Sequence, residues 1–549
     1  MLNMHQKPFY LNDDQIKWVK DTAEKLSTDE KIGQLFVPIG YSTDHDYIDS
    51  LLKHHIGGLF FRSAHLEELR ATFNYAQQNS KVPLLTPANL ESGGDGAVLE
   101  GTGYAPQMAV AAAGNKKYAY ELGKIAAEDA KAAGINWGFA PVVDLDLNFH
   151  SPIMNVRTYG DDTERDIAFS KQFIQAFHDQ NMMTSIKHFP GDGIDERDQH
   201  LLTSVNSLPL SSWWKTYGKI YRELIDFGTK AVMVGHIAFP AYSHNQIPAS
   251  LNEQLLEGLL RHDLGFNGLI ITDATPMVGF STAMPRYQAV PTAIQNGCDM
   301  FLFNHDFEED VSYMKDGLKN GLLTEKRLDE AVLRILATKA SLNLNQDVSI
   351  PSKPLIDYKK EQQEIADQSI TLVKDDQNIL PLAAQKQKRV LLEVLGGFAS
   401  NQRVEETLQN ELTKRGFEVT LYRPEKNFVD LGSVADFKSK YDLVLYAANI
   451  ENASNQTTAR INWKTLYGLG NNLPWFVQEV PTVLVSFGNP YHMFDMPMVK
   501  TVVNAYSNYE HFIKAAVAKL VGEQEFKGHS PIDPNCKNIK LKELMNNAD

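Results

Sequence analysis

The sequence predicts an α/β protein in which a (β/α)8 barrel is followed by an α/β sandwich of three layers. Between residues 30 and 306, about eight short apolar runs alternate with helical patterns, and repeated βα units in this number favour a barrel. The same alternation restarts near residue 355, behind a polar stretch that contains prolines. The length of 549 residues agrees with two domains if one is a large barrel. An open doubly wound sheet is the alternative, but it ordinarily contains fewer strands.

The expected barrel strands are β-branched or aliphatic runs of the kind that buried parallel strands show. The helical patterns between them often end at glycine, which is common just behind a helix C-terminus. The expected strands are 32–39, 58–61, 83–89, 136–145, 182–188, 231–237, 268–273 and 300–303, and the expected helices are 65–78, 116–134, 163–180, 213–228 and 251–265.

A further helix over 325–344 precedes the proline-bearing stretch, which predicts a linker. We therefore expect a barrel domain over residues 1–345, a linker over 346–360 and a sandwich domain over 361–549. The second domain is expected to have strands at 390–394, 419–422, 443–448, 483–487 and 502–505 and helices at 401–416 and 511–522.

Composition excludes several classes of protein. Hydrophobic residues make up 43% of the chain and charged residues 22%, which is typical of a soluble globular enzyme. The net charge of −15 provides no basic surface for a nucleic-acid partner. The sequence shows no signal peptide and no apolar run long enough for a membrane span, and Cys298 and Cys536 form no CxxC motif. We therefore expect a cytoplasmic protein without a membrane partner, and the oligomeric state stays open.

Polar side chains follow most of the expected barrel strands. The active site of a (β/α)8 barrel lies at the carboxyl ends of its strands, so these side chains are the first candidates for function. A single polar strand end is more often a cap or a hydrogen-bonding scaffold. The candidates are Asn89, Glu91, Asp144, Asp146, Lys187, His188, His236, Asp273 and residues 304–306.

Residues 185–205 form the densest cluster of reactive side chains, in a loop that contains Gly191 and Gly193. Asp198 and His200 lie in an Asp-x-His arrangement, in which the carboxylate can hold the imidazole as a general acid or base requires. We expect residues 191–198 to be mobile without substrate, because they offer little apolar surface to bury. A solvated loop whose charges pair with one another is the alternative.

Metal binding is not indicated by the sequence. No HExxH or similar spacing occurs, and the run from Asp144 to Asn155 lacks the glycine and the final glutamate of a calcium loop. Asn452 and Asn455 begin Asn-x-Ser/Thr sequons, which carry no meaning in a protein that is not secreted.

Several motifs resemble glycoside hydrolase family 3 in its β-N-acetylglucosaminidase (NagZ-like) branch. Lys187-His-Phe-Pro-Gly, followed by Asp198-Gln-His200, is similar to the KHFPG and D-x-H signature of the branch, with the same spacing. LGFNGLIITDATPM near residue 264 resembles the nucleophile segment. QSITLVKDDQNILPL and VSFGNPY resemble the α/β-sandwich domain of many members, so the resemblance covers nearly the whole chain.

The resemblance implies roles for individual residues. Asp273 would be the catalytic nucleophile, and His200, assisted by Asp198, the general acid/base. The implied substrate is a small carbohydrate, and no metal or cofactor is needed. Together with the strand ends, the resemblance gives the predicted sugar-binding residues Asn89, Glu91, Asp144, Arg157, Lys187, His188, His236 and Met277.

The chain departs from the branch pattern at three places. Asn89 stands where an Asp normally holds sugar hydroxyls, and an Arg nearby is missing. An amide loses the charge-assisted acceptor and gains a donor, which affects sugar preference. Asp192 replaces a His, and Ala274-Thr-Pro replaces Asp-Leu-Ser. None of these changes removes a proposed catalytic group.

The predicted activity is that of a retaining exo-β-N-acetylglucosaminidase that releases terminal GlcNAc, by family analogy from cell-wall fragments in peptidoglycan recycling. A β-glucosidase and a GlcNAc phosphorylase are alternatives on the same scaffold. The phosphorylase is considered because a neutral acid/base tolerates phosphate, an anion, as the acceptor. A substrate-assisted mechanism on Asp195-Glu196 and a non-catalytic sugar-binding protein are two further alternatives.

Overall fold

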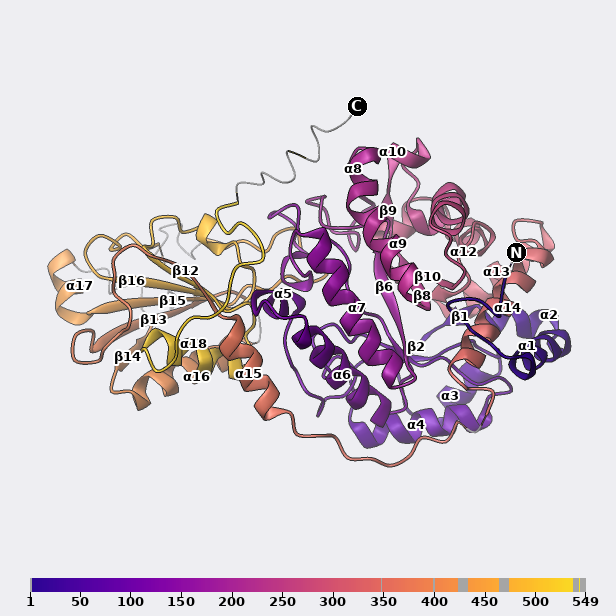
Figure 1. Ribbon diagram of the computed structural model, residues 1–549, viewed down its shortest axis with the longest axis horizontal. Coiled ribbons are helices and arrows are strands. Elements are labelled where there is room, and N and C mark those ends of the chain that lie inside the picture. The colour runs from indigo at the N-terminus through magenta and orange to yellow at the C-terminus, as the bar shows by residue number, and fades with distance from the viewer. Residues whose placement is uncertain are drawn as a thin grey trace.

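The structure, a computed structural model, describes residues 2–346, 348–397, 400–422, 433–463, 473–536 and 543. Figure 1 shows helices wrapped around short strands on one side of the molecule and a second sheet with its own helices on the other. An extended segment between α14 (Glu325–Ser341) and α15 (Lys359–Ser369) runs along the outside and joins them. No helix among these residues is long and apolar enough to cross a membrane.

The first sheet is curled and parallel. Its longest run pairs in the order β10-β8-β6-β5-β4, while β1 pairs with β11 and β2 with β3. Bridges from Gly58 to Leu85 and from Ile271 to Met300 connect these groups, and only Pro38 separates β1 from β2. This arrangement agrees with the predicted barrel. The strands are β1 (Phe36–Val37), β2 (Ile39–Gly40), β3 (Phe60–Phe61), β4 (Pro87–Ala88), β5 (Trp137–Gly138), β6 (Met183–Phe189), β8 (Ala231–Val234), β10 (Leu269–Thr272) and β11 (Phe301–Leu302), with β7 (Ser204–Val205) and β9 (Ile237–Ala238) paired beside them.

The helices around this sheet begin and end at residues suited to those positions. The side chain of Ser27 caps α2 in a capping box, and Asp162 and Thr324 cap α7 and α14. Gly228 ends α9 in the left-handed conformation. The helices are α1 (Asp13–Lys25), α2 (Thr28–Gln34), α3 (His45–Leu52), α4 (Leu66–Asn79), α5 (Gln107–Ala112), α6 (Lys117–Ala132), η1 (Asn155–Arg157), α7 (Thr163–Asp179), α8 (Leu210–Lys215), α9 (Tyr217–Phe227), α10 (Pro240–Ser243), η2 (Ala249–Leu251), η3 (Gln254–Asp263), α11 (Val278–Ser281), α12 (Arg286–Gln295), α13 (Phe307–Lys319) and α14.

The second sheet has the order β12-β17-β16-β15-β13-β14, with helices on its faces (Figure 1). All pairs are parallel except β12 with β17, which is antiparallel. The remaining elements are β12 (Thr371–Asp375), β13 (Arg389–Leu395), α16 (Asn401–Lys414), β14 (Glu418–Leu421), α17 (Val434–Lys440), β15 (Leu443–Ala448), β16 (Thr482–Ser486), η5 (His492–Phe494), β17 (Thr501–Asn504) and α18 (Glu510–Leu520).

The structure differs from the sequence expectations in the first strand and at the start of the second sheet. Residues 32–34, expected to begin the first strand, form the end of α2, because the Ser27 cap starts a helix that extends to Gln34. Strand β12 was not expected. It is an edge strand in which only Thr371 is buried, so its sequence lacks the apolar run by which the other strands were identified.

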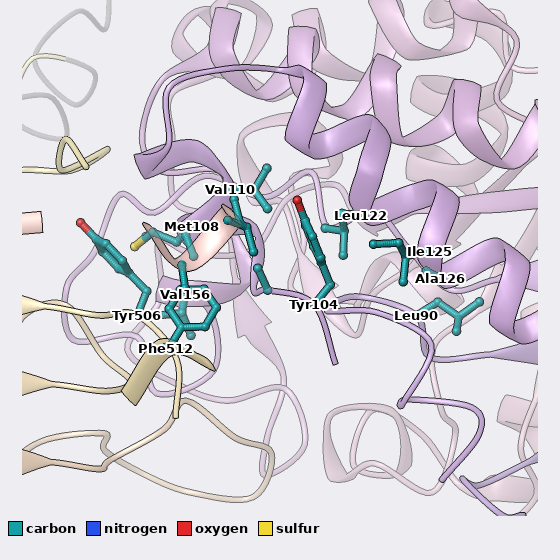
Figure 2. Packing of buried hydrophobic residues seen from close by; sticks show 14 of the residues in the cluster. Leu90, Tyr104, Met108, Val110, Leu122, Ile125, Ala126, Val156, Tyr506 and Phe512 are labelled. Atoms are coloured by element: carbon teal, nitrogen blue, oxygen red, sulfur yellow. The ribbon is translucent and has the colours of Figure 1, made fainter. Parts of the chain in front are cut away.

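The two sheets are joined through one apolar cluster. Met108 and Val110 on α5 are buried in the same cluster as Tyr506 and Phe512, which follow β17 (Figure 2). The imidazole of His511 adds a hydrogen bond to the carbonyl of Tyr104 at 2.9 Å. Because apolar burial of this kind resists separation, the second sheet is held against the carboxyl ends of the first.

Candidate active site

Asp273 follows β10 at the carboxyl end of the first sheet. One oxygen, Oδ1, accepts the main-chain N–H of Ala274 at 2.7 Å, while Oδ2 lies 3.9 Å from Nε2 of His188. Burial raises the pKa of the Asp273 carboxyl, but the nearby imidazoles, led by His188, outweigh it and hold the pKa below its ordinary value. The side chain remains 14% exposed. Asp273 is therefore an ionised carboxylate that a ligand can reach.

Asp198 and His200 form the predicted dyad. Oδ1 of Asp198 accepts hydrogen bonds from Nδ1 of His200 at 2.6 Å and from its main-chain N–H at 2.9 Å. The other oxygen, Oδ2, accepts the main-chain N–H of Asn455 at 2.8 Å. Burial raises the pKa of Asp198, but these hydrogen bonds outweigh it and lower the pKa. Because Nδ1 is bonded to Asp198, Nε2 of His200 is the nitrogen left to exchange a proton with a ligand.

Five of the eight residues predicted to bind sugar form two groups of charges in contact. Glu91 accepts a two-pronged hydrogen bond from Arg157, with both distances 2.8 Å, and Lys187 lies 2.6 Å from its Oε1. Burial raises the pKa of Glu91, but the two cations hold it well below its ordinary value. In the second group, Asp144 accepts a hydrogen bond from Nδ1 of His188 at 2.7 Å. This contact orients the His188 ring toward Asp273.

His236 lies beneath the nucleophile segment and is fully buried. Its Nε2 donates to the carbonyl of Ala274 at 3.0 Å, and its Nδ1 accepts from the hydroxyl of Ser250 at 2.8 Å. Burial lowers its pKa to about 4, so the ring is neutral at neutral pH. Both ring nitrogens are occupied, and the geometry is that of a residue that supports the segment behind Asp273.

The other residues predicted from the strand ends and the resemblance differ in exposure and in their contacts. Asn89 is exposed at the end of β4, whereas Met277 is buried and precedes α11. Asp146 accepts hydrogen bonds from Asn155 and Tyr491 at 2.8 and 3.0 Å, and burial raises its pKa to about 7. It therefore joins the two sheets.

The last strand end is structural. Asn304 donates to Asp310 at 2.9 Å, and Asp306 caps α13. These two contacts hold α13 to the strand end.

The loop over 191–198 is less exposed than its sequence indicates. Residues 191–194 are buried, and the main-chain N–H of Asp192 donates to Asp144 at 2.7 Å. Burial and the neighbouring Asp144 raise the pKa of Asp192 well above its ordinary value. Asp195 is held by Arg197, and Glu196 pairs with His150, so this adjacent acidic pair faces partners of its own.

Sequence reasoning missed the contributions of the second sheet. Asn455 reaches Asp198 through a main-chain group, for which no side-chain pattern gives a signal. Tyr491 follows β16 in the VSFGNPY segment, and the strand-end rule applied to the second sheet would have indicated it. Among the residues that the structure describes, no cluster of His, Cys, Asp and Glu is arranged to hold a metal ion.

The ion pairs of Glu91 predict a measurable loss of stability. Glu91→Gln removes the charge shared by the buried Lys187 and the largely buried Arg157, and breaking a buried pair on one side costs about 3–5 kcal/mol. We expect chemical denaturation to show a loss of this size and sugar affinity to fall. Asp21→Asn, which breaks the exposed pair between Asp21 and Lys17, is the matched control and should change little. Equal stability of both variants would contradict the prediction.

Comparison with known proteins defines the class of this molecule as a glycoside hydrolase. A β-N-acetylglucosaminidase/β-glucosidase of Cellulomonas fimi is 41% identical over 559 residues, covering 98% of this chain and 99% of the relative. A β-hexosaminidase A of Pseudoalteromonas piscicida is 26% identical over 64% of the chain and 63% of its own length. The chain belongs to glycosyl hydrolase family 3, whose N-terminal domain model matches residues 27–338.

Solved structures agree over nearly the full length. A β-glucoside phosphorylase, BglX, bound to 2FGlc superimposes with a TM-score of 0.91 at 41% identity, covering 97% of this chain and 99% of that one. A family 3 β-N-acetylglucosaminidase from Paenibacillus sp. FPU-7 gives a TM-score of 0.80 at 25% identity, covering 93% and 100%. The protein is therefore a family 3 glycosidase of the kind that acts on β-N-acetylglucosamine or β-glucosides.

Proposed function

We propose that the protein is a retaining, exo-acting β-glycosidase that removes terminal β-linked GlcNAc through a covalent intermediate on Asp273. The observation that carries this proposal is that His200, which Asp198 holds by Nδ1, is bonded through its carbonyl to the N–H of Val278 in the segment behind Asp273, at 3.0 Å. Together with His188 and His236, His200 lowers the pKa of the Asp273 carboxylate. The 41% identity to a β-N-acetylglucosaminidase/β-glucosidase supports it. We also propose that the chain is divided into a complete barrel over residues 1–345, a linker over 346–360 and a sandwich domain over 361–549.

The first step forms a bond between Asp273 and the anomeric carbon of the sugar. Before this step, Asp198 stabilises the protonated imidazole of His200. As the glycosidic bond breaks, Nε2 of His200 gives its proton to the departing oxygen. In the second step, neutral His200 takes a proton from water, whose oxygen attacks the anomeric carbon and releases Asp273. An imidazole in place of the usual second carboxyl group keeps this two-step logic.

The sugar itself would be held by the charges around Glu91. Arg157, Lys187 and Glu91 offer donors and acceptors to hydroxyl groups, and Asn89, two positions before Glu91, is exposed. His188 and Met277 would complete the pocket. Asp144 and His236 would act by orienting His188 and the segment behind Asp273.

Phosphorolysis is a second candidate, in which phosphate takes the place of water. Two observations favour it: the acid/base is an imidazole, which becomes neutral before the acceptor arrives and does not repel an anion, and the chain resembles a β-glucoside phosphorylase at 41% identity. The same likeness favours glucose as a competing sugar.

One assay separates these activities. Release of nitrophenol from the β-nitrophenyl glycosides of GlcNAc and of glucose is measured at matched concentrations, with and without inorganic phosphate, and the sugar product is identified. Higher kcat/KM on the GlcNAc glycoside, with free GlcNAc as the product, supports the proposal. GlcNAc 1-phosphate as the main product would make the protein a phosphorylase, and preference for glucose would make it a β-glucoside enzyme. The cytoplasmic location and the cell-wall substrate stay predictions.

A further inference from the structure

Residues 452–456 of the chain, which follow β15 of the second sheet, lie against the catalytic loops of the first. The side chain of Asn452 donates to the carbonyl of Ser151 at 3.1 Å and to Oδ1 of Asn155 at 2.7 Å. The main-chain N–H of Ala453 and the side-chain amide of Gln456 both donate to the carbonyl of Pro152, at 3.3 Å each. The 452–456 segment is thus fixed to residues 151–155 at several points.

The same segment contacts the dyad. The main-chain N–H of Asn455 donates to Oδ2 of Asp198, the oxygen that His200 does not use. Asp198 is 1% exposed, and hydrogen bonds to both oxygens stabilise the ionised form of a buried carboxylate and hold it in one orientation. His200 supplies donors to one oxygen only. Asn455 therefore supplies the bond that fixes the other.

The conformation of Asn455 suits this contact. Its φ is +65°, in the left-handed region that Asn tolerates better than most residues and that β-branched residues avoid. The Asn455 side chain is exposed, so its contact with the dyad passes through the main chain alone. The two sequons of this segment thus have a structural use: Asn452 anchors the segment, and Asn455 allows its turn.

We propose that the 452–456 segment is a positioning element for the acid/base dyad, acting through the main-chain N–H of Asn455. This inference rests on the proposed function of His200. With Asp198 held on both oxygens, the imidazole is already oriented before substrate arrives, and the buried residues 191–194 support the same arrangement. In this proposal, contacts from the 452–456 segment orient Asp198 and His200, and closure of the 191–198 loop on substrate is not needed for it.

The test compares substitutions that keep or disturb the Asn455 turn. Asn455→Val disfavours φ of +65° and should move the main-chain N–H away from Asp198. Asn455→Gly allows the same φ and keeps the N–H in place, so it should retain most of the wild-type rate. Ser454→Val places the same side chain at a neighbouring exposed residue whose φ is not positive, and it is the matched control. Asn452→Ala, which removes two anchoring bonds, is a second route to the same loss.

The dependence of the rate on the leaving group distinguishes a positioning role from a merely structural one. Asn455→Val should lower kcat on a GlcNAc disaccharide about tenfold, or about 1.4 kcal/mol, with KM unchanged. Formation of the glycosyl-enzyme from the dinitrophenyl glycoside, which needs no proton, should be unchanged. Equal losses on both substrates, or a loss in Asn455→Gly as large as in Asn455→Val, would overturn the proposal.

Hydrogen exchange tests the contact apart from catalysis. Without any sugar, the amides of residues 195–202 should be protected in the wild-type protein and exchange faster in Asn455→Val and Asn452→Ala, but not in Ser454→Val. Fast exchange of these amides in the wild-type protein would overturn the positioning role. If exchange behaves as expected while no glycoside is cleaved, the proposed function fails and the contact stands.

Discussion

Asp273→Asn should lose at least about 10³-fold in turnover on every glycoside, whatever its leaving group. The amide has nearly the shape of the carboxylate and can still accept the N–H of Ala274 through its oxygen, so the fold should be kept. It cannot form the glycosyl ester, because an amide is a poor nucleophile at this position. Steady-state rates on a dinitrophenyl glycoside and a disaccharide measure the loss, and the thermal unfolding midpoint checks the fold.

Trapping adds a direct measure of the same role. A 2-fluoro glycoside with a good leaving group should add one glycosyl unit to the intact mass of the wild-type protein, at the peptide that contains Asp273, and none to Asp273→Asn. Glu196→Gln is the matched control, because Glu196 is an exposed carboxylate of the dyad loop paired with His150, and it should keep its activity. If Asp273→Asn retained more than about a tenth of the activity, the nucleophile would be another residue. If Glu196→Gln lost most activity instead, the substrate-assisted alternative would gain support.

The fold could be predicted from the sequence where burial produces a regular pattern of apolar residues. Buried parallel strands such as β8 are apolar throughout, and the amphipathic helices between the strands have clear caps, so the sequence predicts the order of the elements. The sequence overestimated strand lengths, because apolar residues continue past the paired region. Only Trp137 and Gly138 of the expected 136–145 strand form β5. The edge strand β12 could not be identified in this way, since only Thr371 of its residues is buried.

The candidate site could be predicted as far as it depends on strand ends. This rule predicts Asp273, His188 and Glu91; in the structure His188 lies 3.9 Å from Asp273, and Glu91 pairs with Lys187, the neighbour of His188 in the chain. The rule cannot tell a residue that contacts the ligand from one that supports the site: both ring nitrogens of His236 are bonded within the protein, to Ser250 and to the carbonyl of Ala274. Asn455 was beyond reach for another reason: it is separated from Asp198 by 257 positions and acts through its backbone.

The effect of His200→Ala should depend on how much the leaving group needs a proton. A sugar alkoxide departs poorly without general-acid help, which is worth typically about 10² to 10⁴-fold, so cleavage of a GlcNAc disaccharide should nearly cease. A dinitrophenolate departs without a proton, and the first step on such a glycoside should be spared. Pre-steady-state release of the phenolate measures that step separately from turnover. His150→Ala, at a partly exposed histidine paired with Glu196, is the matched control and should leave both substrates unaffected.

The same variant should also be slow in the second step, because His200 is the base that activates water. The intermediate on Asp273 should then accumulate, with a burst of phenolate close to one per active site followed by slow turnover. Azide needs no base, so added azide should restore turnover on the aryl glycoside and yield the β-glycosyl azide, with retained configuration. If His200→Ala lost both aryl and disaccharide activity equally and azide had no effect, His200 would be a binding or structural residue. The contact between Asn455 and Asp198 would then hold a structural loop, and the acid would have to be sought at Asp195, Glu196 or a residue of the second sheet.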